Sequence, residues 1–264
     1  MPGRIVLFLL LVSIPIYSPA QKDSLAHPTR FDKYYIYSGI LDARDQVIAP
    51  FHWNETQWLI VGVLASAESA LIFTNGDKNI QSFAQRNRSN ISNFIENNFG
   101  DPFGSGLYPA MVVGTSYLVG CIFHKDHPKH MAMLTAKSVV ISGATTFIIK
   151  SITERYRPDQ TSNPEQWLGP KGLFSYDSYP SGNTTVAFAT ATMIALEYPR
   201  PLIIPILAYG LAAATAYGRI NGNYHWGSDV LLGSALGYFT SRLIYKHNNW
   251  SKCRKKKKIT ALSE

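Results

Sequence analysis

The chain has 264 residues, enough to bury a sizeable core in one domain. Charged residues make up 16% of it, below the quarter that is usual in soluble proteins, and hydrophobic residues make up 46%. The mean hydropathy of −0.04 is low for a protein built only of membrane spans, so the individual segments must decide the class. The formal charge of +8 comes without a recognition motif, which argues against nucleic-acid binding.

Residues 1–20 have the pattern of a secretory signal peptide, with Arg4, an apolar run from Ile5 to Ile16 and small residues before Gln21. A short uncleaved anchor is the alternative, and either one directs the chain into the export pathway. Residues 21–55 are polar and aromatic, and we expect a surface helix or loop that leads into a bundle.

Residues 56–247 contain six apolar segments of about 14 to 19 residues, at or below the length that crosses a hydrocarbon core of ~30 Å. They predict an all-α, six-helix bundle of membrane type. Glu68 lies within the first segment, so we expect it to face the interior and pair with Lys137 or a hydroxyl. The segments are Trp58–Phe73, Leu107–Phe123, Met131–Ile149, Thr184–Glu197, Leu202–Tyr217 and Val230–Tyr245.

The connecting segments are polar. Residues 74–105 are rich in asparagine and are expected to be exposed to water, and Cys121, in an apolar run, is expected to be buried. The link 124–130 carries three histidines, but it is short and far from the site proposed below, so we predict no metal site there. Residues 248–264 hold six cations, which predict either a solvated tail or a segment attracted to anionic lipid headgroups.

Three polar islands interrupt the apolar sequence at Lys150–Pro158, Tyr179–Asn183 and Gly218–Asp229. Between the last two islands the chain is apolar, except around Tyr198–Pro201, where two prolines break any helix. Two helices of about 16 residues would therefore form an antiparallel hairpin that returns to its starting end. We predict that all three islands meet at one end of the bundle.

The islands carry residues that suit an anion. Lys150 and Arg157 are seven positions apart, hence on one helix face. The alternative is that these cations only stabilise the negative end of the helix dipole. Gly182 follows Ser181 at a helix start, where backbone N–H groups attract anions, although a plain serine cap fits as well. Asp229 lies four residues after His225 and can orient its imidazole.

Together the islands read K-x6-R-P, P-S-G-N and G-R-x5-H-x3-D, a pattern that closely resembles the type 2 phosphatidic acid phosphatase (PAP2) and vanadium haloperoxidase superfamily. The resemblance implies that His225 is the nucleophile and Asp229 its orienting partner. It also implies that a phosphate cradle is formed without metal or other cofactor by Lys150, Arg157, Ser181, Gly182 and Arg219.

Two residues depart from the family pattern. Gly218 replaces the usual serine, and Asn183 replaces the usual histidine that protonates the leaving group. Because asparagine cannot deliver a proton in this range, Asn183 is left as a leaving-group contact. Other acids near the islands are Asp177, Tyr179 and Tyr224.

The sequence therefore predicts a phosphatase that hydrolyses a phosphomonoester or diphosphate, of a lipid, through a phosphohistidine at His225. The expected partners are a phosphorylated lipid and the membrane, and the expected location is the bacterial inner membrane with the site facing the periplasm. The alternatives are a catalytically impaired relative that binds lipid phosphate or a partner protein, a periplasmic non-specific acid phosphatase, and a haloperoxidase. A periplasmic, membrane-associated bundle without true crossings remains the alternative topology.

Overall fold

The computed structural model describes residues 29–100, 102, 105–170 and 178–248. The predicted signal segment and nearly all of the predicted basic tail lie outside the described residues. Within the described ranges every regular element is a helix. The elements are α2 (Lys33–Ile48), the 3-10 helix η1 (Ala49–His52), α3 (Glu55–Phe73), α4 (Gly76–Arg86), α5 (Asn90–Ile95), the π-helix η2 (Glu96–Gly100), α7 (Leu107–Ile122), α8 (Asp126–Thr153), α9 (Gly182–Glu197), α10 (Ile203–Asn221) and α11 (Gly227–His247).

The six predicted apolar segments each fall almost wholly within one helix, namely α3 or one of α7 to α11. A plain six-helix bundle is nevertheless an incomplete description, because the described residues form nine α-helices. The three additional helices, α2, α4 and α5, are short or polar, so no apolar run marks them in the sequence. Two of them, α2 and α4, bury carboxylates on their inner faces beside a single apolar side chain each.

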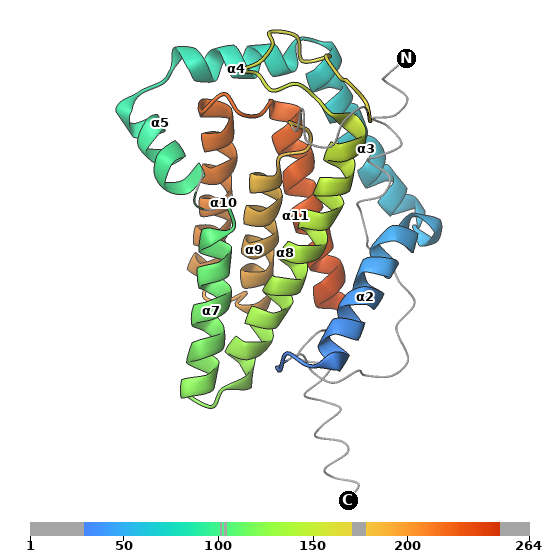
Figure 1. Cartoon of the computed structure of the whole chain (residues 1–264), viewed down its shortest axis with the longest axis vertical. Coiled ribbons are helices and arrows are strands. Elements are labelled where there is room, and N and C mark those ends of the chain that lie inside the picture. The colour runs from blue at the N-terminus through green and yellow to red at the C-terminus, as the bar shows by residue number, and fades with distance from the viewer. Residues whose placement is uncertain (1–28, 101, 103–104, 171–177, 249–264) are drawn as a thin grey trace, which may run out of the picture.

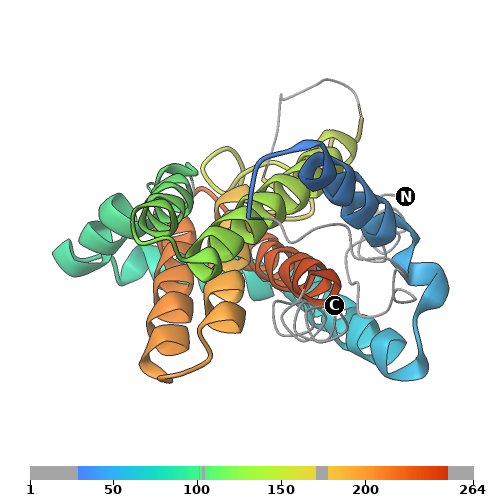
Figure 2. The same ribbon diagram turned by 90° about the horizontal axis from the view of Figure 1, so that it is seen from below.

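The helices α7 to α11 run roughly side by side, and α9 packs against α8, α10 and α11 (Figure 1). Helix α4 lies across one end of this group, while α2 and α3 flank it on the side of α8 and α11 (Figures 1 and 2). The predicted hairpin is present, since α9 ends at Glu197 and α10 begins at Ile203, just beyond Pro199 and Pro201. It returns the chain to the end of the bundle that carries α4.

Helices α9 and α11 approach each other closely because α11 carries two glycines on the shared face. A Cβ atom at Gly237 would lie 2.2 Å from the carbonyl oxygen of Thr185, and one at Gly233 would lie 2.5 Å from that of Ser181. Small residues four apart allow the same close backbone contact between helices in membranes. This contact fixes the start of α9 against the first turns of α11.

The outer surface is apolar over several helices. Three helices of the described part are long and apolar enough to cross a membrane: α3, α8 and α10. Helix α2 is inverted relative to a helix in water, because Ile36, Ile40 and Val47 are exposed while Asp42 and Asp45 are buried. A helix is present where a surface helix or loop was expected in residues 21–55, and its polar face is the inner one.

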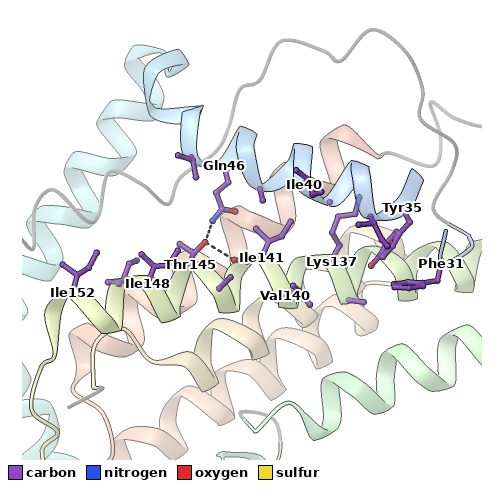
Figure 3. A pocket seen from close by; sticks show the side chains of 17 residues that line it. Phe31, Tyr35, Ile40, Gln46, Lys137, Val140, Ile141, Thr145, Ile148 and Ile152 are labelled. Carbon is purple, nitrogen blue, oxygen red and sulfur yellow. Dashed lines mark hydrogen bonds between the residues drawn. The ribbon is translucent and has the colours of Figure 1, made fainter. Parts of the chain in front are cut away.

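An apolar groove of about 1,020 Å³ separates α2 from α8 (Figure 3). Gln46 of α2 donates a hydrogen bond to Thr145 of α8 across it, at 2.7 Å. Tyr35 and Lys137 lie towards one end of the groove, and Ile148 and Ile152 lie towards the other. The two helices thus meet through a few polar contacts rather than a packed interface.

The end of the bundle away from α4 is held by buried ion pairs. Glu197 at the end of α9 contacts Nε2 of His127 at 2.7 Å and Nδ1 of His130 at 2.9 Å. Lys137 pairs with Asp42 at 2.8 Å, with both side chains almost fully buried. Of the two partners expected for Glu68, Lys137 is instead paired with Asp42 of α2, and the Tyr179 hydroxyl is the one that lies against Glu68. Glu68 is buried as predicted.

Candidate active site

The three polar islands converge at the end of the bundle that carries α4. The backbone N–H of Ser181 donates to the carbonyl oxygen of Asp229 at 2.9 Å, which joins the second island to the third. Asn183 joins them again: with its amide turned so that the oxygen faces Arg219, that oxygen accepts from Nε and Nη1 of Arg219 at 3.3 and 3.2 Å. The first island adds Lys150, whose Cε would lie 3.8 Å from a Cβ built on Gly182. Residues almost 80 positions apart therefore surround one small space.

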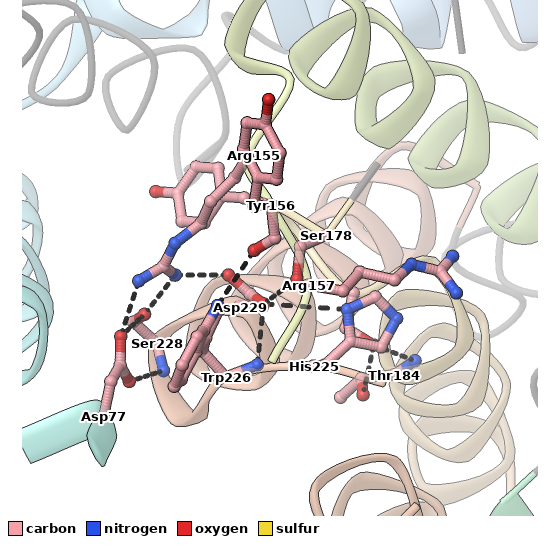
Figure 4. Close-up of polar contacts among 12 residues, drawn as sticks. Asp77, Arg155, Tyr156, Arg157, Ser178, Thr184, His225, Trp226, Ser228 and Asp229 are labelled. Carbon is pink, nitrogen blue, oxygen red and sulfur yellow. Dashed lines mark hydrogen bonds and ion pairs between the residues drawn. The ribbon is translucent and has the colours of Figure 1, made fainter. Parts of the chain in front are cut away.

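His225 and Asp229 lie at the centre of this space (Figure 4). Nδ1 of His225 is 3.7 Å from Oδ2 of Asp229, which is a close charge contact but longer than a hydrogen bond. Asp229 is held by other donors: Ser178 Oγ and the Trp226 N–H donate to Oδ2, and Arg155 Nη1 donates to Oδ1. The carboxylate is thus fixed in place beside the imidazole.

The surroundings keep His225 neutral and Asp229 ionised. Burial lowers the pKa of His225 to about 4, and the charges of Lys150 and Arg219 add to this effect while Asp229 opposes it. For Asp229, burial acts to raise the pKa, but the Arg155 guanidinium and the neighbouring donors outweigh it and lower the pKa to about 2. At neutral pH the site therefore presents an uncharged imidazole, whose nitrogen is nucleophilic.

Arg157 and Arg219 bring guanidinium groups to the same space. The Arg157 side chain extends towards His225 (Figure 4). Arg219 lies over the ring of Tyr224, with its guanidinium carbon 4.2 Å from the ring centroid, and its carbonyl oxygen accepts from the N–H groups of Tyr224 and His225. With Lys150, three cations therefore lie near one neutral imidazole, an arrangement suited to a tetrahedral oxyanion.

The family model that matches this chain is "PAP2 superfamily", over residues 131–253, which include all three islands. The match makes this part of the chain similar to the PAP2 superfamily, over a little less than half of its length. The matched range runs from α8 through α11, so it contains the helices that position the islands.

A curated relative, the lipid A 1-phosphatase of Porphyromonas gingivalis, is 45% identical over 87 residues, which are 30% of this chain and 19% of the relative. The chain therefore spans about a fifth of that protein's length. A transmembrane PAP2-type phosphatidylglycerolphosphate phosphatase from Bacillus subtilis aligns over 72% of this chain and 92% of its own, with a TM-score of 0.51 and 17% identity. That similarity shows the fold. A structure of Aquifex aeolicus LpxE aligns with 21% identity over 64% of this chain and 94% of its own, at a TM-score of 0.46.

One predicted role within the motif is changed by the geometry. The Ser181 N–H donates to the carbonyl oxygen of Asp229, so it is not directed at a phosphate, and the Ser181 hydroxyl caps α9 by accepting from the Thr184 N–H. Gly182 and Asn183 remain as the first residues of α9, whose N–H groups lack partners within the helix.

The glycine at position 218 has a packing reason. A Cβ there would lie 3.0 Å from Cα of Gly100 and 3.1 Å from Cα of Glu96, both in η2. Thr215, one turn earlier, donates to the carbonyl oxygen of Phe99 at 3.0 Å, so α10 and η2 touch backbone to backbone. A serine at this position would have to displace η2, which explains the departure from the usual PAP2 pattern.

Two of the three candidate replacement acids, Tyr179 and Tyr224, lie in the described residues. Asp177 lies outside the described residues. Tyr179 is fully buried, and burial together with the adjacent Glu68 raises its pKa well above the usual value, so it holds its proton. The Tyr224 ring is covered by the Arg219 guanidinium.

The sequence pattern did not indicate three residues that hold the candidate site together: Arg155, Ser178 and Asp77. Arg155 and Ser178 lie inside or next to islands that were recognised, so their positions were a usable signal. Asp77 lies in the segment 74–105, which was expected to be exposed to water, yet Asp77 is fully buried against α11. That expectation is wrong for α4, because its inner face packs on the site.

Proposed function

We propose that this protein is a phosphatase that transfers a phosphoryl group from a lipid phosphomonoester or diphosphate to His225 and then to water. The observation that carries the proposal is a neutral, buried His225 beside Asp229 and among three cations, Lys150, Arg157 and Arg219. Arginine and lysine side chains stabilise the charge that spreads over the phosphoryl oxygens in such reactions.

In the first step Nε2 of His225 forms a bond to phosphorus, and the bond from phosphorus to the leaving oxygen breaks. Asp229 stabilises the positive charge that develops on the imidazole. In the second step water attacks phosphorus, the N–P bond breaks, and inorganic phosphate leaves with His225 restored. A diphosphate suits this site best, because its leaving group is a phosphate that departs without a proton from Asn183.

A lipid is the proposed substrate class on two grounds. Three helices of the described part are long and apolar enough to span a bilayer, so the reaction centre lies where lipid headgroups are accessible. The relative with 45% identity in the matched region is named as a lipid A 1-phosphatase. We propose the inner membrane as the location, with the site at the periplasmic face.

The test is release of inorganic phosphate by the purified full-length protein in detergent, from a panel of lipid monophosphates and diphosphates. The wild-type protein is expected to release phosphate, and His225→Ala is expected to lose this activity. An acid-labile, base-stable phosphoenzyme should form with wild type and not with His225→Ala. Equal background release by both proteins across the panel would reject the proposal.

A second candidate is an impaired relative that binds lipid phosphate. It is favoured by Asn183, which stands where an acid is needed but has no acidic proton to deliver to a leaving group. Asn183→His tests it, because general acid catalysis contributes about 10²–10⁴-fold. We expect this variant to raise the release rate from a monophosphate by at least about 10-fold and from a diphosphate by much less. Asn183→Gln, which also lacks a proton, is the control and should not raise the rate.

A further inference from the structure

Helix α4 is linked to the centre of the site by a buried carboxylate of its own, Asp77, and the buried guanidinium of Arg155. Arg155 donates through Nη2 to Oδ2 of Asp77 at 2.7 Å and through Nη1 to Oδ1 of Asp229. All three side chains are fully buried. The guanidinium therefore bridges a carboxylate of α4 to the carboxylate that faces His225 (Figure 4).

We propose that Arg155 and Asp77 are positioning residues for the reaction: they fix the Asp229 carboxylate so that it faces Nδ1 of His225 and leaves Nε2 directed at the phosphoryl group. This inference rests on the proposed function. Neither residue contacts the proposed substrate, and both act through Asp229.

Arg155 fits this role by its shape. Its Nε donates to the carbonyl oxygen of Pro164 at 2.9 Å, and its guanidinium lies over the rings of Trp167 and Trp226, at 4.8 and 5.7 Å from their centroids. The planar fork is therefore held in one orientation, and only a fork can serve two carboxylates at once. Without Nη1 as a donor, Oδ1 of Asp229 would lose its anchor, and the carboxylate could rotate away from His225.

Asp77 fits the role by its contacts at the start of α11. Its Oδ1 accepts from the Ser228 N–H at 2.8 Å, and its Oδ2 accepts from the Ser228 hydroxyl at 2.6 Å. Ser228 in turn accepts from Nη1 of Arg155 at 2.7 Å. Asp77 thus holds both the guanidinium and the helix turn that carries Asp229.

A glycine at position 227 allows α4 and α11 to come this close. Gly227 lies between Trp226 and Ser228, where a Cβ would lie 2.9 Å from Cδ1 of Ile80 and 3.4 Å from Oδ1 of Asp77. Any side chain at this position would push α4 away from α11. The absence of one lets a carboxylate 148 to 152 residues earlier in the chain reach the turn that ends at Asp229.

The experiment compares Asp77→Asn and Arg155→Lys with Asp42→Asn. Lysine keeps the charge of Arg155 but replaces the planar fork, with its two terminal nitrogens, by a single nitrogen. Asp42 is a matched control, because it is also a buried carboxylate paired with a buried cation, Lys137, at the opposite end of the bundle. All variants are compared at equal folded fraction, set from their thermal unfolding.

We expect kcat for a lipid phosphate to fall by about 10- to 100-fold in Asp77→Asn and Arg155→Lys, with KM unchanged, since misplaced groups cost up to about 10². Asp42→Asn should keep kcat. In an Asp229→Asn background, Asp77→Asn should have no further effect on kcat, because the residue it acts through is gone. Equal kcat losses in the two backgrounds, or a loss no larger than that of Asp42→Asn, would overturn the proposal.

A readout that needs no turnover separates this inference from the proposed function. Nitrogen-15 NMR of the His225 ring reports which nitrogen carries the proton. We expect one tautomer, protonated at Nδ1, in the wild type and a mixture in Asp77→Asn and Arg155→Lys. An unchanged tautomer in both variants rejects the positioning role, whereas absent phosphate release from the wild type rejects only the phosphatase.

Discussion

His225 titrates far below an ordinary histidine, which has a consequence for the pH dependence of the reaction. Its pKa of about 4 means that the nucleophilic, neutral form persists into acid. The folded pKa is below the unfolded one, so the native state binds fewer protons between pH 4 and 6.5, and stability from this group is lost as the pH falls through that window.

We therefore expect the acid limb of kcat/KM to bend near pH 4 rather than near pH 6.5. The measurement is the initial rate of phosphate release from pH 3.5 to 8, with each sample returned to pH 7 and assayed again to exclude unfolding. A reversible bend near pH 6.5 would contradict a buried, neutral His225.

At the scale of single residues, the sequence indicated His225, Asp229, Lys150, Arg157 and Arg219, because the spacing within each island survives in the fold. It did not indicate what binds Asp229. The bonds from Arg155 to Asp229 and to Asp77 join residues 74 and 78 positions apart, and no local pattern encodes such a pairing. The backbone N–H of Ser181 was expected in the cradle and is instead bonded to Asp229, because a helix cap and an anion contact use the same residue types at the same place.

At the scale of helices, the contact between α9 and α11 depends on the absence of a side chain at position 237. Gly237→Ala places a methyl group 2.2 Å from the Thr185 carbonyl, so the helices must separate. We expect a loss of about 1–3 kcal/mol in unfolding free energy, or roughly 2–4 °C in Tm for each kcal/mol in a chain of this size.

The matched control is Gly210→Ala in α10, where a Cβ meets nothing within 4 Å. This substitution should leave Tm unchanged or raise it, because alanine favours a helix over glycine by up to about 1 kcal/mol. Both proteins are measured by thermal unfolding in the same detergent. Equal Tm values for the two variants would show that the close helix contact is not required.

The helices themselves were predictable where an apolar run ends at proline, glycine or a polar island, as at both ends of α9. They were not predictable where the helix carries few apolar residues. Helix α4 buries Asp77 and Ala84 only, so its pattern resembles that of a surface helix. In helix α2 the apolar face is exposed and the acidic face is buried, an orientation that the sequence pattern did not indicate.

At the scale of the whole molecule, the end of the bundle away from the site carries cations of its own. Lys125 and Arg200 lie in the links at this end and Lys129 lies in the first turn of α8, and such cations favour the cytoplasmic side. Cys121, expected to be buried, is exposed at this same end, because α7 packs through few of its residues. Cys121 can therefore report on which side of the membrane this end of the bundle lies.

In a Cys253→Ser variant, we expect Cys121 to react with a membrane-impermeant maleimide in inside-out vesicles and not in intact spheroplasts. The control is Lys78→Cys at the exposed side of α4, in a chain with both native cysteines replaced by serine, which should show the reverse. Labelling of both positions from one side, or release of the protein by high salt without detergent, would contradict a membrane-spanning bundle with the site outside.

The contact of Arg155 with both Asp77 and Asp229 also has a consequence for biosynthesis. A ribosome that has completed α10 has already made all three cations of the cradle, but Asp77 and Arg155 still lack the turn that they hold. His225 and Asp229 are made only afterwards, in the turn before α11 and in its first turn. The proposed site is therefore incomplete until α11 has docked against α4, and turnover would report that this docking has taken place.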